Sequence, residues 1–192
     1  MSSNRVGVLA IQGSFSKHIE SLLRSRHPAD QISEVRTPDD LDQVDRLIIP
    51  GGESTTVGLL MQHTGLDKAI IDRAKKGLPI WGTCMGMIML AAEIEVKTQF
   101  SLNLLDITVR RNAFGAQVHS FETTLDFAGL NEPLEAVFIR APIVTRTGPN
   151  VKTLATYQDK NVAVQQGKIL GTSFHPELTD DTRLHKYFLN IQ

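Results

Sequence analysis

The single cysteine of the chain, Cys84, lies between two glycines in the sequence Gly82-Thr83-Cys84-Met85-Gly86. A sharp strand-to-helix turn needs glycines on both sides, because the backbones there approach too closely for a Cβ. At such a turn the thiol lies at a helix N-terminus, which favours the thiolate. The N–H of Met85 then points to where an oxyanion would form. The pattern indicates a nucleophile, and a buried structural cysteine is the alternative interpretation.

A second group that could do chemistry is Phe174-His175-Pro176-Glu177, which follows an apolar, strand-like run. A cysteine nucleophile needs an imidazole to take its proton and give it to the leaving amine. The imidazole in turn needs a carboxylate that fixes its tautomer. A spacing of two at a strand end can aim His175 and Glu177 to one side. The alternative is an exposed turn with a solvated Glu177.

A third group is Pro50-Gly51-Gly52-Glu53-Ser54-Thr55, which also follows an apolar run. The glycine pair lets backbone N–H groups point into a cleft, where Gly52 would give a second donor to an oxyanion. Ser54 and Thr55 can cap the helix that follows. A plain turn with a helix cap explains the same residues. A phosphate-binding P-loop is excluded, because its Gly-Lys-[Ser/Thr] ending is missing.

Up to residue 92, short apolar runs alternate with amphipathic stretches, which is typical of β-α-β units around a parallel sheet. We expect strands at residues 6–11, 32–35, 46–49 and 78–81, and helices at residues 15–24, 55–62, 66–76 and 85–92. Later strand-like runs, with turn signals at Gly115 and Gly129, lie at residues 104–111, 117–125, 135–140, 151–157, 163–166 and 168–174. These later runs predict an antiparallel extension, closed by a helix at residues 180–190. Residues 1–192 are expected to form one compact α/β domain.

The composition excludes several classes of protein. The chain has 192 residues, of which 41% are hydrophobic and 21% charged, and its net charge is −1. This charge gives no reason to expect a nucleic acid or an anionic membrane as a partner. No apolar run approaches the roughly 18 residues of a membrane helix, and no signal peptide is expected. One cysteine forms no internal disulfide and no multi-thiolate zinc site, so we expect a cytoplasmic protein. We expect no bound metal and no cofactor.

Seven blocks carry a family resemblance. They are Val8-Leu9-Ala10-Ile11-Gln12-Gly13, residues 50–56, Gly82-Thr83-Cys84, Arg111-Asn112-Ala113-Phe114-Gly115, Gln117 with Ser120-Phe121-Glu122, Phe138-Ile139-Arg140-Ala141-Pro142 and Phe174-His175-Pro176-Glu177-Leu178-Thr179. In this order they resemble the class I, triad-type glutamine amidotransferases, and among these the glutaminase subunit of pyridoxal 5′-phosphate synthase. The blocks that begin at Arg111 and Phe138 distinguish this family from other class I glutaminases, which share only the triad.

The resemblance implies a flavodoxin-like, three-layer α/β fold with a mostly parallel central sheet and an antiparallel extension. It also implies an enzyme without a cofactor of its own, which hydrolyses L-glutamine to L-glutamate and ammonia through a cysteine thioester. The ammonia would pass to a separate synthase subunit that builds the vitamin B6 cofactor.

The resemblance also implies roles for individual residues. Cys84 would be the nucleophile, His175 the general acid and base, and Glu177 its orienting carboxylate. Gly52 and Met85 would give the oxyanion-hole amides. The glutamine substrate would be held by Gly52, Glu53, Ser54, Arg111, Ile139 and Arg140. An arginine can grip the α-carboxylate with two parallel hydrogen bonds. Without the resemblance, a surface charge on a strand is the favoured interpretation of Arg111, and a structural ion pair is the favoured interpretation of Arg140.

The sequence departs from the family pattern at two positions. Met85 stands where the family more often has Ala, and a bulkier side chain there would narrow the pocket beside Cys84. Ile143 stands where a polar or charged residue is common, so a contact from that side chain is in doubt.

Other functions are compatible with parts of this pattern. Another ammonia-donating glutaminase, such as that of imidazole glycerol phosphate synthase, would share the triad but not the block that begins at Arg111. A catalytically silent binding subunit would keep the turn at Cys84 only for packing. A cysteine peptidase or another hydrolase on the same fold is a further alternative. An assay of ammonia release from glutamine separates these functions.

The glycine pair also predicts a switch. Gln12-Gly13 ends the first strand at the same sheet edge as Gly51, Gly52 and Cys84. The peptide between Gly51 and Gly52 can flip at little steric cost, and a partner that docks near Gln12 would select one orientation. We therefore expect the isolated chain to be a poor glutaminase.

Overall fold

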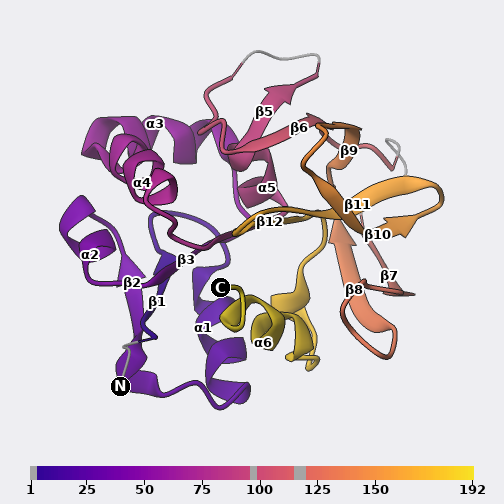
Figure 1. The fold of residues 1–192 in the computed structure, drawn as a ribbon, viewed down its shortest axis with the longest axis horizontal. Coiled ribbons are helices and arrows are strands. Elements are labelled where there is room, and N and C mark those ends of the chain that lie inside the picture. Colours follow the sequence, from indigo (N-terminus) through magenta and orange to yellow (C-terminus); the bar gives the residue numbers. More distant parts are fainter. Residues whose placement is uncertain (1–3, 96–98, 115–119) are drawn as a thin grey trace.

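The computed structural model describes residues 4–95, 99–114 and 120–192 (Figure 1). The helices are α1 (Phe15–Arg24), α2 (Pro38–Asp42), α3 (Ser54–Thr64), α4 (Leu66–Lys75), α5 (Met85–Leu90) and α6 (Arg183–Leu189), with the short 3-10 helices η1 (Ala29–Gln31) and η2 (Pro176–Leu178). The strands are β1 (Val6–Leu9), β2 (Ile32–Val35), β3 (Arg46–Ile49), β4 (Ile80–Thr83), β5 (Ala91–Ile94), β6 (Leu105–Arg110), β7 (Ser120–Leu125), β8 (Leu134–Ile139), β9 (Ile143–Thr147), β10 (Lys152–Tyr157), β11 (Lys160–Gln166) and β12 (Ile169–Thr172).

A large central sheet runs through the molecule in the order β2-β1-β3-β4-β12-β11-β9-β6-β5, and β10 pairs with β11. The first five strands in this order run parallel to one another. The contacts from β12 to β11, from β11 to β9 and from β9 to β6 are antiparallel. The structure thus confirms a mostly parallel core with an antiparallel extension.

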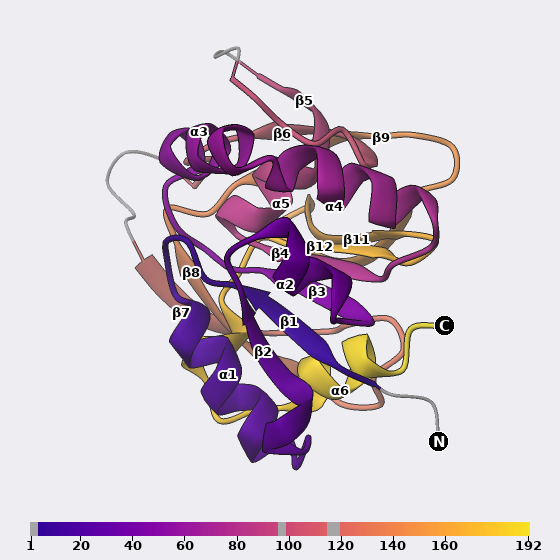
Figure 2. The same ribbon diagram turned by 90° about the vertical axis from the view of Figure 1, so that its left-hand side faces the viewer.

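Hydrophobic side chains on the two faces of the parallel strands form two separate cores. Along β3, Leu47 and Ile49 belong to the first core, whereas Ile48 between them belongs to the second core on the opposite face. This alternation follows from the two-residue period of a strand. Helices α3, α4 and α5 cover one face, and α1 and α6 cover the opposite face (Figure 2). The result is the expected three-layer arrangement.

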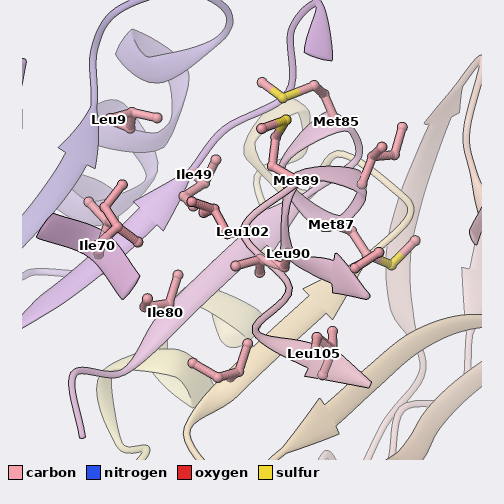
Figure 3. Close-up of a cluster of buried hydrophobic side chains, with 14 of the residues drawn as sticks. Leu9, Ile49, Ile70, Ile80, Met85, Met87, Met89, Leu90, Leu102 and Leu105 are labelled. Atoms are coloured by element: carbon pink, nitrogen blue, oxygen red, sulfur yellow. The ribbon is translucent and has the colours of Figure 1, made fainter. Parts of the chain in front are cut away.

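Helix α5 is apolar on all sides, and its three methionines lie in the first core. Met85, Met87 and Met89 are each at most 2% exposed. Figure 3 shows them beside Ile49 of β3 and Leu105 of β6. Flexible thioether side chains fill irregular gaps well, so α5 is embedded between α3 and the sheet. No helix of the described residues is long and apolar enough to cross a membrane.

The expected elements differ from the observed ones in several places. The predicted helix at residues 85–92 ends at Leu90, because the chain becomes extended at Ala91 and forms β5 beside β6. The last predicted strand, at residues 168–174, is not part of the antiparallel extension alone, since β12 also lies parallel to β4. Strands β7 and β8 form a separate two-stranded sheet.

Helix α2 and strand β9 were not predicted, and part of one predicted strand lies outside the described residues. Helix α2 begins with a capping box, in which Thr37 and Asp40 bond each other's backbone N–H groups. Strand β9 was also missed, although its first residues are apolar and buried. The turn at Gly115 and the start of the predicted strand at residues 117–125 fall within residues 115–119, outside the described part of the chain.

Two glycines allow α5 to pack directly on β3 and β4. A Cβ on Gly86 would run into the carbonyl oxygen of Ile49, and a Cβ on Gly82 would run into that of Gly86. Backbone atoms cannot move aside as a flexible side chain can. The turn between β4 and α5 therefore depends on glycine at both positions.

We expect Gly86→Ala to lower the free energy of unfolding by about 1–3 kcal/mol, as overpacking does elsewhere. Urea denaturation measures this change. Gly58→Ala in α3 is the matched control, because its Cβ would meet only side-chain atoms of Phe100 and Met89, the nearest at 3.2 Å, and helix propensity favours alanine. Equal stability of the two variants would contradict the close approach at Gly86.

Candidate active site

The predicted site residues gather at one edge of the sheet. Gln12, Gly51, Cys84 and His175 each follow closely after one of the adjacent parallel strands β1, β3, β4 and β12. The carboxyl ends of parallel strands meet at one edge, where ligands bind in open α/β sheets. Residues that are far apart in the chain thereby become neighbours.

Cys84 occupies a strained turn between β4 and α5. Its φ of 51° and ψ of −106° lie in a region that residues with a Cβ rarely adopt. Three backbone hydrogen bonds hold this conformation: Cys84 N–H donates to Thr172 O at 2.7 Å, and Cys84 O accepts from the N–H groups of Met87 at 3.1 Å and Ile88 at 3.3 Å. The thiol is only partly buried, and Sγ lies 3.8 Å from the carbonyl oxygen of Ile139. The turn expected around Cys84 is therefore present.

His175 and Glu177 lie directly beside Cys84 and touch each other. Nδ1 of His175 is 2.7 Å from Oε1 of Glu177, and His175 and Cys84 line the same cavity. The His175 N–H donates to Val137 O at 2.8 Å, and Pro176 then starts the short helix η2. Glu177 is only 1% exposed, so the alternative of a solvated Glu177 in an exposed turn is wrong.

Charge stabilisation within this pair sets its protonation. Burial alone would raise the pKa of Glu177, but His18 and the hydrogen bond from His175 outweigh it and lower that pKa to about 2. Burial likewise opposes a charged His175, yet the hydrogen bonds and charges of Cys84 and Glu177 raise its pKa to about 10. Glu177 then stabilises the fold above its ordinary pKa of 4.5 and His175 below its ordinary 6.5. Both contributions are complete between pH 4.5 and pH 6.5. The contribution of Glu177 is lost as the pH falls toward 2, and that of His175 is lost as the pH rises toward 10.

The glycine loop after β3 is tied to the end of β1. The Ser14 N–H donates to Gly51 O at 3.1 Å, and the Glu53 N–H donates to Oε1 of Gln12 at 2.8 Å. Since C=O and N–H point in opposite directions in a trans peptide, the Gly52 N–H points away from Ser14. The orientation of this peptide is thus linked to residues 12–14, as the sequence suggested.

Glu53, and not Ser54 or Thr55, caps helix α3. Its carboxylate accepts from Thr55 N–H at 3.1 Å and from Thr56 N–H at 2.7 Å. The prediction of a Ser54-Thr55 cap is wrong because α3 begins at Ser54, which leaves Glu53 in the capping position. The Thr56 hydroxyl and these N–H groups lower the pKa of Glu53 to about 2. The Glu53 side chain is therefore engaged in its own helix.

A cavity of about 330 Å³ opens beside the Cys84 thiol. Its lining contains every residue predicted to hold substrate or oxyanion, namely Gly52, Glu53, Ser54, Met85, Arg111, Ile139 and Arg140. Within the described residues no carboxylate pairs with Arg111 or Arg140, in contrast to six other arginines that have a carboxylate within 4.0 Å. The alternative of a structural ion pair at Arg140 therefore has no support in the described chain.

Three residues of this cavity region were not predicted. Ile88 and Asn112 line the cavity, and Gln99 supports it by accepting from Arg111 at 2.9 Å and from Ser54 at 3.3 Å. Ile88 follows Met85 by three residues, so helical spacing could have identified it. Asn112 lies within the block that begins at Arg111, which carries part of the family resemblance. No local signal points to Gln99.

The two departures from the family pattern are both buried. The Met85 side chain packs into the first core next to Met89 and also borders the cavity (Figure 3). Ile143 is 6% exposed, opens β9 and pairs in register with Arg110. Ile143 is therefore part of the core and does not line the cavity.

A larger hollow of about 520 Å³ borders α6, away from this site. Its ionisable lining residues are Arg183, Lys186 and Tyr187. Asp181 holds the Arg183 guanidinium at 2.6 Å, and Tyr187 donates to Gln165 at 2.6 Å. Its lining brings together no nucleophile and base, so the smaller cavity at Cys84 is the candidate active site.

Comparison with known proteins adds independent evidence. The SNO glutamine amidotransferase family matches residues 8–192. A protein of Herpetosiphon aurantiacus named pyridoxal 5′-phosphate synthase subunit PdxT is 54% identical over 97% of this chain and 99% of its own. Its namesake from Desulforamulus reducens is 52% identical over 97% and 98%.

A solved structure titled as a glutamine amidotransferase superposes with a TM-score of 0.92 at 47% identity, covering 97% of both chains. The residues that the family matches, 8–192, include all elements that surround Cys84, His175 and Glu177. The chain belongs to the SNO glutamine amidotransferase family.

Proposed function

We propose that this chain hydrolyses L-glutamine to L-glutamate and ammonia, with Cys84, His175 and Glu177 as its catalytic triad. The observation that carries the proposal is the hydrogen-bonded pair of His175 and Glu177, 2.7 Å apart, beside a strained and partly exposed Cys84. A thiol, an imidazole next to it and a buried carboxylate behind the imidazole are the groups that acyl transfer to sulfur requires.

In the first half of the reaction the Cys84 sulfur attacks the side-chain amide carbon of glutamine. The negative charge that develops on the amide oxygen is stabilised by the N–H groups of Gly52 and Met85. His175, which carries the proton taken from the thiol, gives it to the leaving nitrogen. Ammonia departs and a thioester between Cys84 and the glutamyl group is formed.

In the second half His175 takes a proton from water as that water attacks the thioester carbon. The same two N–H groups stabilise the second oxyanion, and the Cys84 sulfur leaves with the proton from His175. Glu177 holds the imidazole in the tautomer that both halves need. Glutamate is released and the triad returns to its first state.

The rest of the cavity suits an amino-acid substrate. Arg111 and Arg140 are cationic groups that can grip the α-carboxylate. Gln99 holds the Arg111 guanidinium at 2.9 Å. Glu53, Ser54 and Ile139 complete the wall around the substrate. Because its carboxylate caps α3, Glu53 contributes through its backbone and through the position it gives Ser54.

We further propose that the ammonia passes to a synthase subunit of pyridoxal 5′-phosphate synthase. The proteins from Herpetosiphon aurantiacus and Desulforamulus reducens are named as subunits of that enzyme, and they match this chain over nearly its whole length. Residues 1–192 act as one glutaminase domain in the cytoplasm, which agrees with a single cysteine and a net charge of −1. The same charge argues against a nucleic-acid partner.

Replacement of Cys84 tests the nucleophile. We expect Cys84→Ala and Cys84→Ser to abolish ammonia release from glutamine, because no other group can form the thioester. A glutamine-mimicking electrophile should label Cys84 covalently in the unaltered protein. Thermal unfolding checks that the variants still fold. Ammonia release that persists in folded Cys84→Ala would show that the nucleophile lies elsewhere.

Replacement of the base and its carboxylate tests their roles. His175→Asn should lower kcat by about 10² to 10⁴, the usual contribution of general acid–base catalysis. Glu177→Gln should have a smaller effect, because the imidazole stays in place but is poorly oriented. Steady-state ammonia assays measure both. If Glu177→Gln were the more damaging change, the two roles could not stand as assigned.

The link between the glycine loop and residues 12–14 predicts that a partner activates the chain. We expect the isolated chain to be slow, since ammonia set free at neutral pH becomes ammonium and is useless as a nucleophile. Contact near Gln12 would act on the Gly51 peptide through the bonds to Ser14 and Glu53. One oxyanion donor corresponds to about 10² to 10³ in rate. A titration of the purified chain with the matching synthase subunit measures the gain, and a lone chain as fast as the saturated complex would exclude this mechanism.

A further inference from the structure

Two arginines that are adjacent in the chain have acceptors of different charge. The Arg110 guanidinium is paired with a carboxylate, Oε2 of Glu95, at 2.7 Å. The Arg111 guanidinium, which borders the cavity, donates from Nη1 to the neutral amide oxygen Oε1 of Gln99 at 2.9 Å. Arg111 is therefore fixed in place by a group that carries no charge.

The Gln99 amide can meet Arg111 only with its oxygen. An arginine side chain has N–H donors and no acceptor, so the oxygen of the amide and not its NH2 group must face the guanidinium. The same oxygen accepts from the Ser54 hydroxyl at 3.3 Å. Nε2 of Gln99 is buried and has no hydrogen-bond partner among the described residues. The polar contacts of this side chain are thus made by one oxygen that faces two donors.

Gln99 joins two walls of the cavity from behind. Ser54 is the first residue of α3 and is 2% exposed, and Arg111 directly follows β6. Ser54 and Arg111 both line the cavity beside Cys84, whereas Gln99 itself does not. Gln99 therefore acts on a molecule in the cavity through the side chains that it holds.

The carboxylates closest to Gln99 along the chain are bonded to other groups. Glu93 accepts from the Thr108 hydroxyl at 2.9 Å, and Glu95 accepts from Arg110 at 2.7 Å. A carboxylate in the place of the Gln99 amide would form an ion pair with Arg111, and a carboxylate of the substrate would have to compete with it. The amide oxygen fixes the guanidinium without this competition.

The positive charge of Arg111 is thereby left for a ligand. A guanidinium has more N–H groups than the bond to Gln99 uses, and the others can form two parallel hydrogen bonds to a carboxylate. When the side-chain amide of glutamine lies at Cys84, the anionic group of that substrate is its α-carboxylate. A fixed cation with no charge partner among the described residues is suited to recognise that group.

We propose that Gln99 is a positioning residue for substrate recognition, whose neutral amide oxygen holds the Arg111 guanidinium at the cavity and leaves its charge for the α-carboxylate of glutamine. This role rests on the proposed function, because it takes glutamine as the ligand of the cavity. An amide at this position fixes Arg111, whereas a carboxylate of the same shape would fix Arg111 and also neutralise it.

Calorimetric titration with L-glutamine tests the proposal on the Cys84→Ala chain in complex with the matching synthase subunit, where glutamine is bound but not hydrolysed. Gln99→Glu keeps the shape and the acceptor but adds a charge, so we expect Kd to rise about 10- to 100-fold, as for the loss of a hydrogen bond to a charged group. Gln99→Met keeps the size and removes the acceptor, and Kd should rise only about 2- to 10-fold. An unchanged Kd in Gln99→Glu, or an equal rise in both variants, would overturn the proposal.

Two controls separate the contact with Arg111 from other effects of the added charge. Gln62 is exposed on α3, so Gln62→Glu adds the same charge outside the cavity and should leave Kd unchanged. L-Glutaminol, in which a hydroxymethyl group replaces the α-carboxylate, should bind to Gln99→Glu as it does to the protein with Gln99. A rise in Kd with Gln62→Glu that matches Gln99→Glu, or an equal weakening of glutaminol and glutamine, would overturn the proposal.

Steady-state kinetics of the complex with Cys84 intact give a second readout. Gln99→Glu should raise KM in parallel with Kd and leave kcat within about threefold, because a residue that acts on substrate binding alone changes KM. A fall in kcat at constant KM would overturn the proposal.

The outcomes also separate this inference from the proposed function. If the Cys84→Ala complex binds no glutamine at all, the proposed function fails and this inference fails with it. Glutamine binding that does not respond to Gln99→Glu refutes this inference alone. Thermal unfolding checks that each variant folds. If Gln99→Glu does not fold, Gln99→Met decides, because an unchanged Kd in that variant would show that Arg111 needs no acceptor at this position.

Discussion

A buried, ionised carboxylate is the constraint around which this site is organised. Glu177 is 1% exposed, and a charge in a protein interior is tolerated only when hydrogen-bond donors surround it. The Ser14 hydroxyl before α1 and the His175 ring after β12 donate to one oxygen of this carboxylate, and the His18 ring of α1 lies 3.4 Å from the other. The packing of α1 on the sheet is therefore coupled to the protonation of the triad. A change that moves α1 by even a small distance acts on the reacting groups.

The parallel sheet supplies the second condition, which is proximity. Its adjacent strands β1, β3, β4 and β12 end at the same edge, and the segments after them carry Gln12, Gly51, Cys84 and His175. The strained backbone of Cys84 is held by the bond to Thr172 O and by the glycine contacts below α5. Rigid elements thus fix the nucleophile and the base, while the glycine loop between β3 and α3 is joined to its surroundings by two hydrogen bonds to residues 12–14. Such a loop is the part of the site that can respond to a partner.

The sequence predicted those features that depend on neighbouring residues. The turn at Cys84, the pairing of His175 with Glu177 and the bounds of α1, β2 and β3 all follow from local spacing and local apolar patterns. The capping box of α2 was also present in the sequence but was not used. The cap of α3 was predicted at Ser54 and Thr55 but lies at Glu53, because the exact start of a helix depends on the loop before it.

The features that were missed depend on contacts between distant segments. His18 and His185 are 167 residues apart, and neither has a local pattern that distinguishes it from any other histidine. Gln99 reaches Arg111 and Ser54 only because β6 and α3 meet beside the cavity.

The central claim, that an ionised Glu177 holds His175 as an imidazolium, is tested most directly by an NMR pH titration of the His175 ring. The account predicts that the ring stays charged through neutral pH and loses its proton near pH 10. A ring that is already neutral at pH 7, with a midpoint at or below the ordinary value of 6.5, would contradict it.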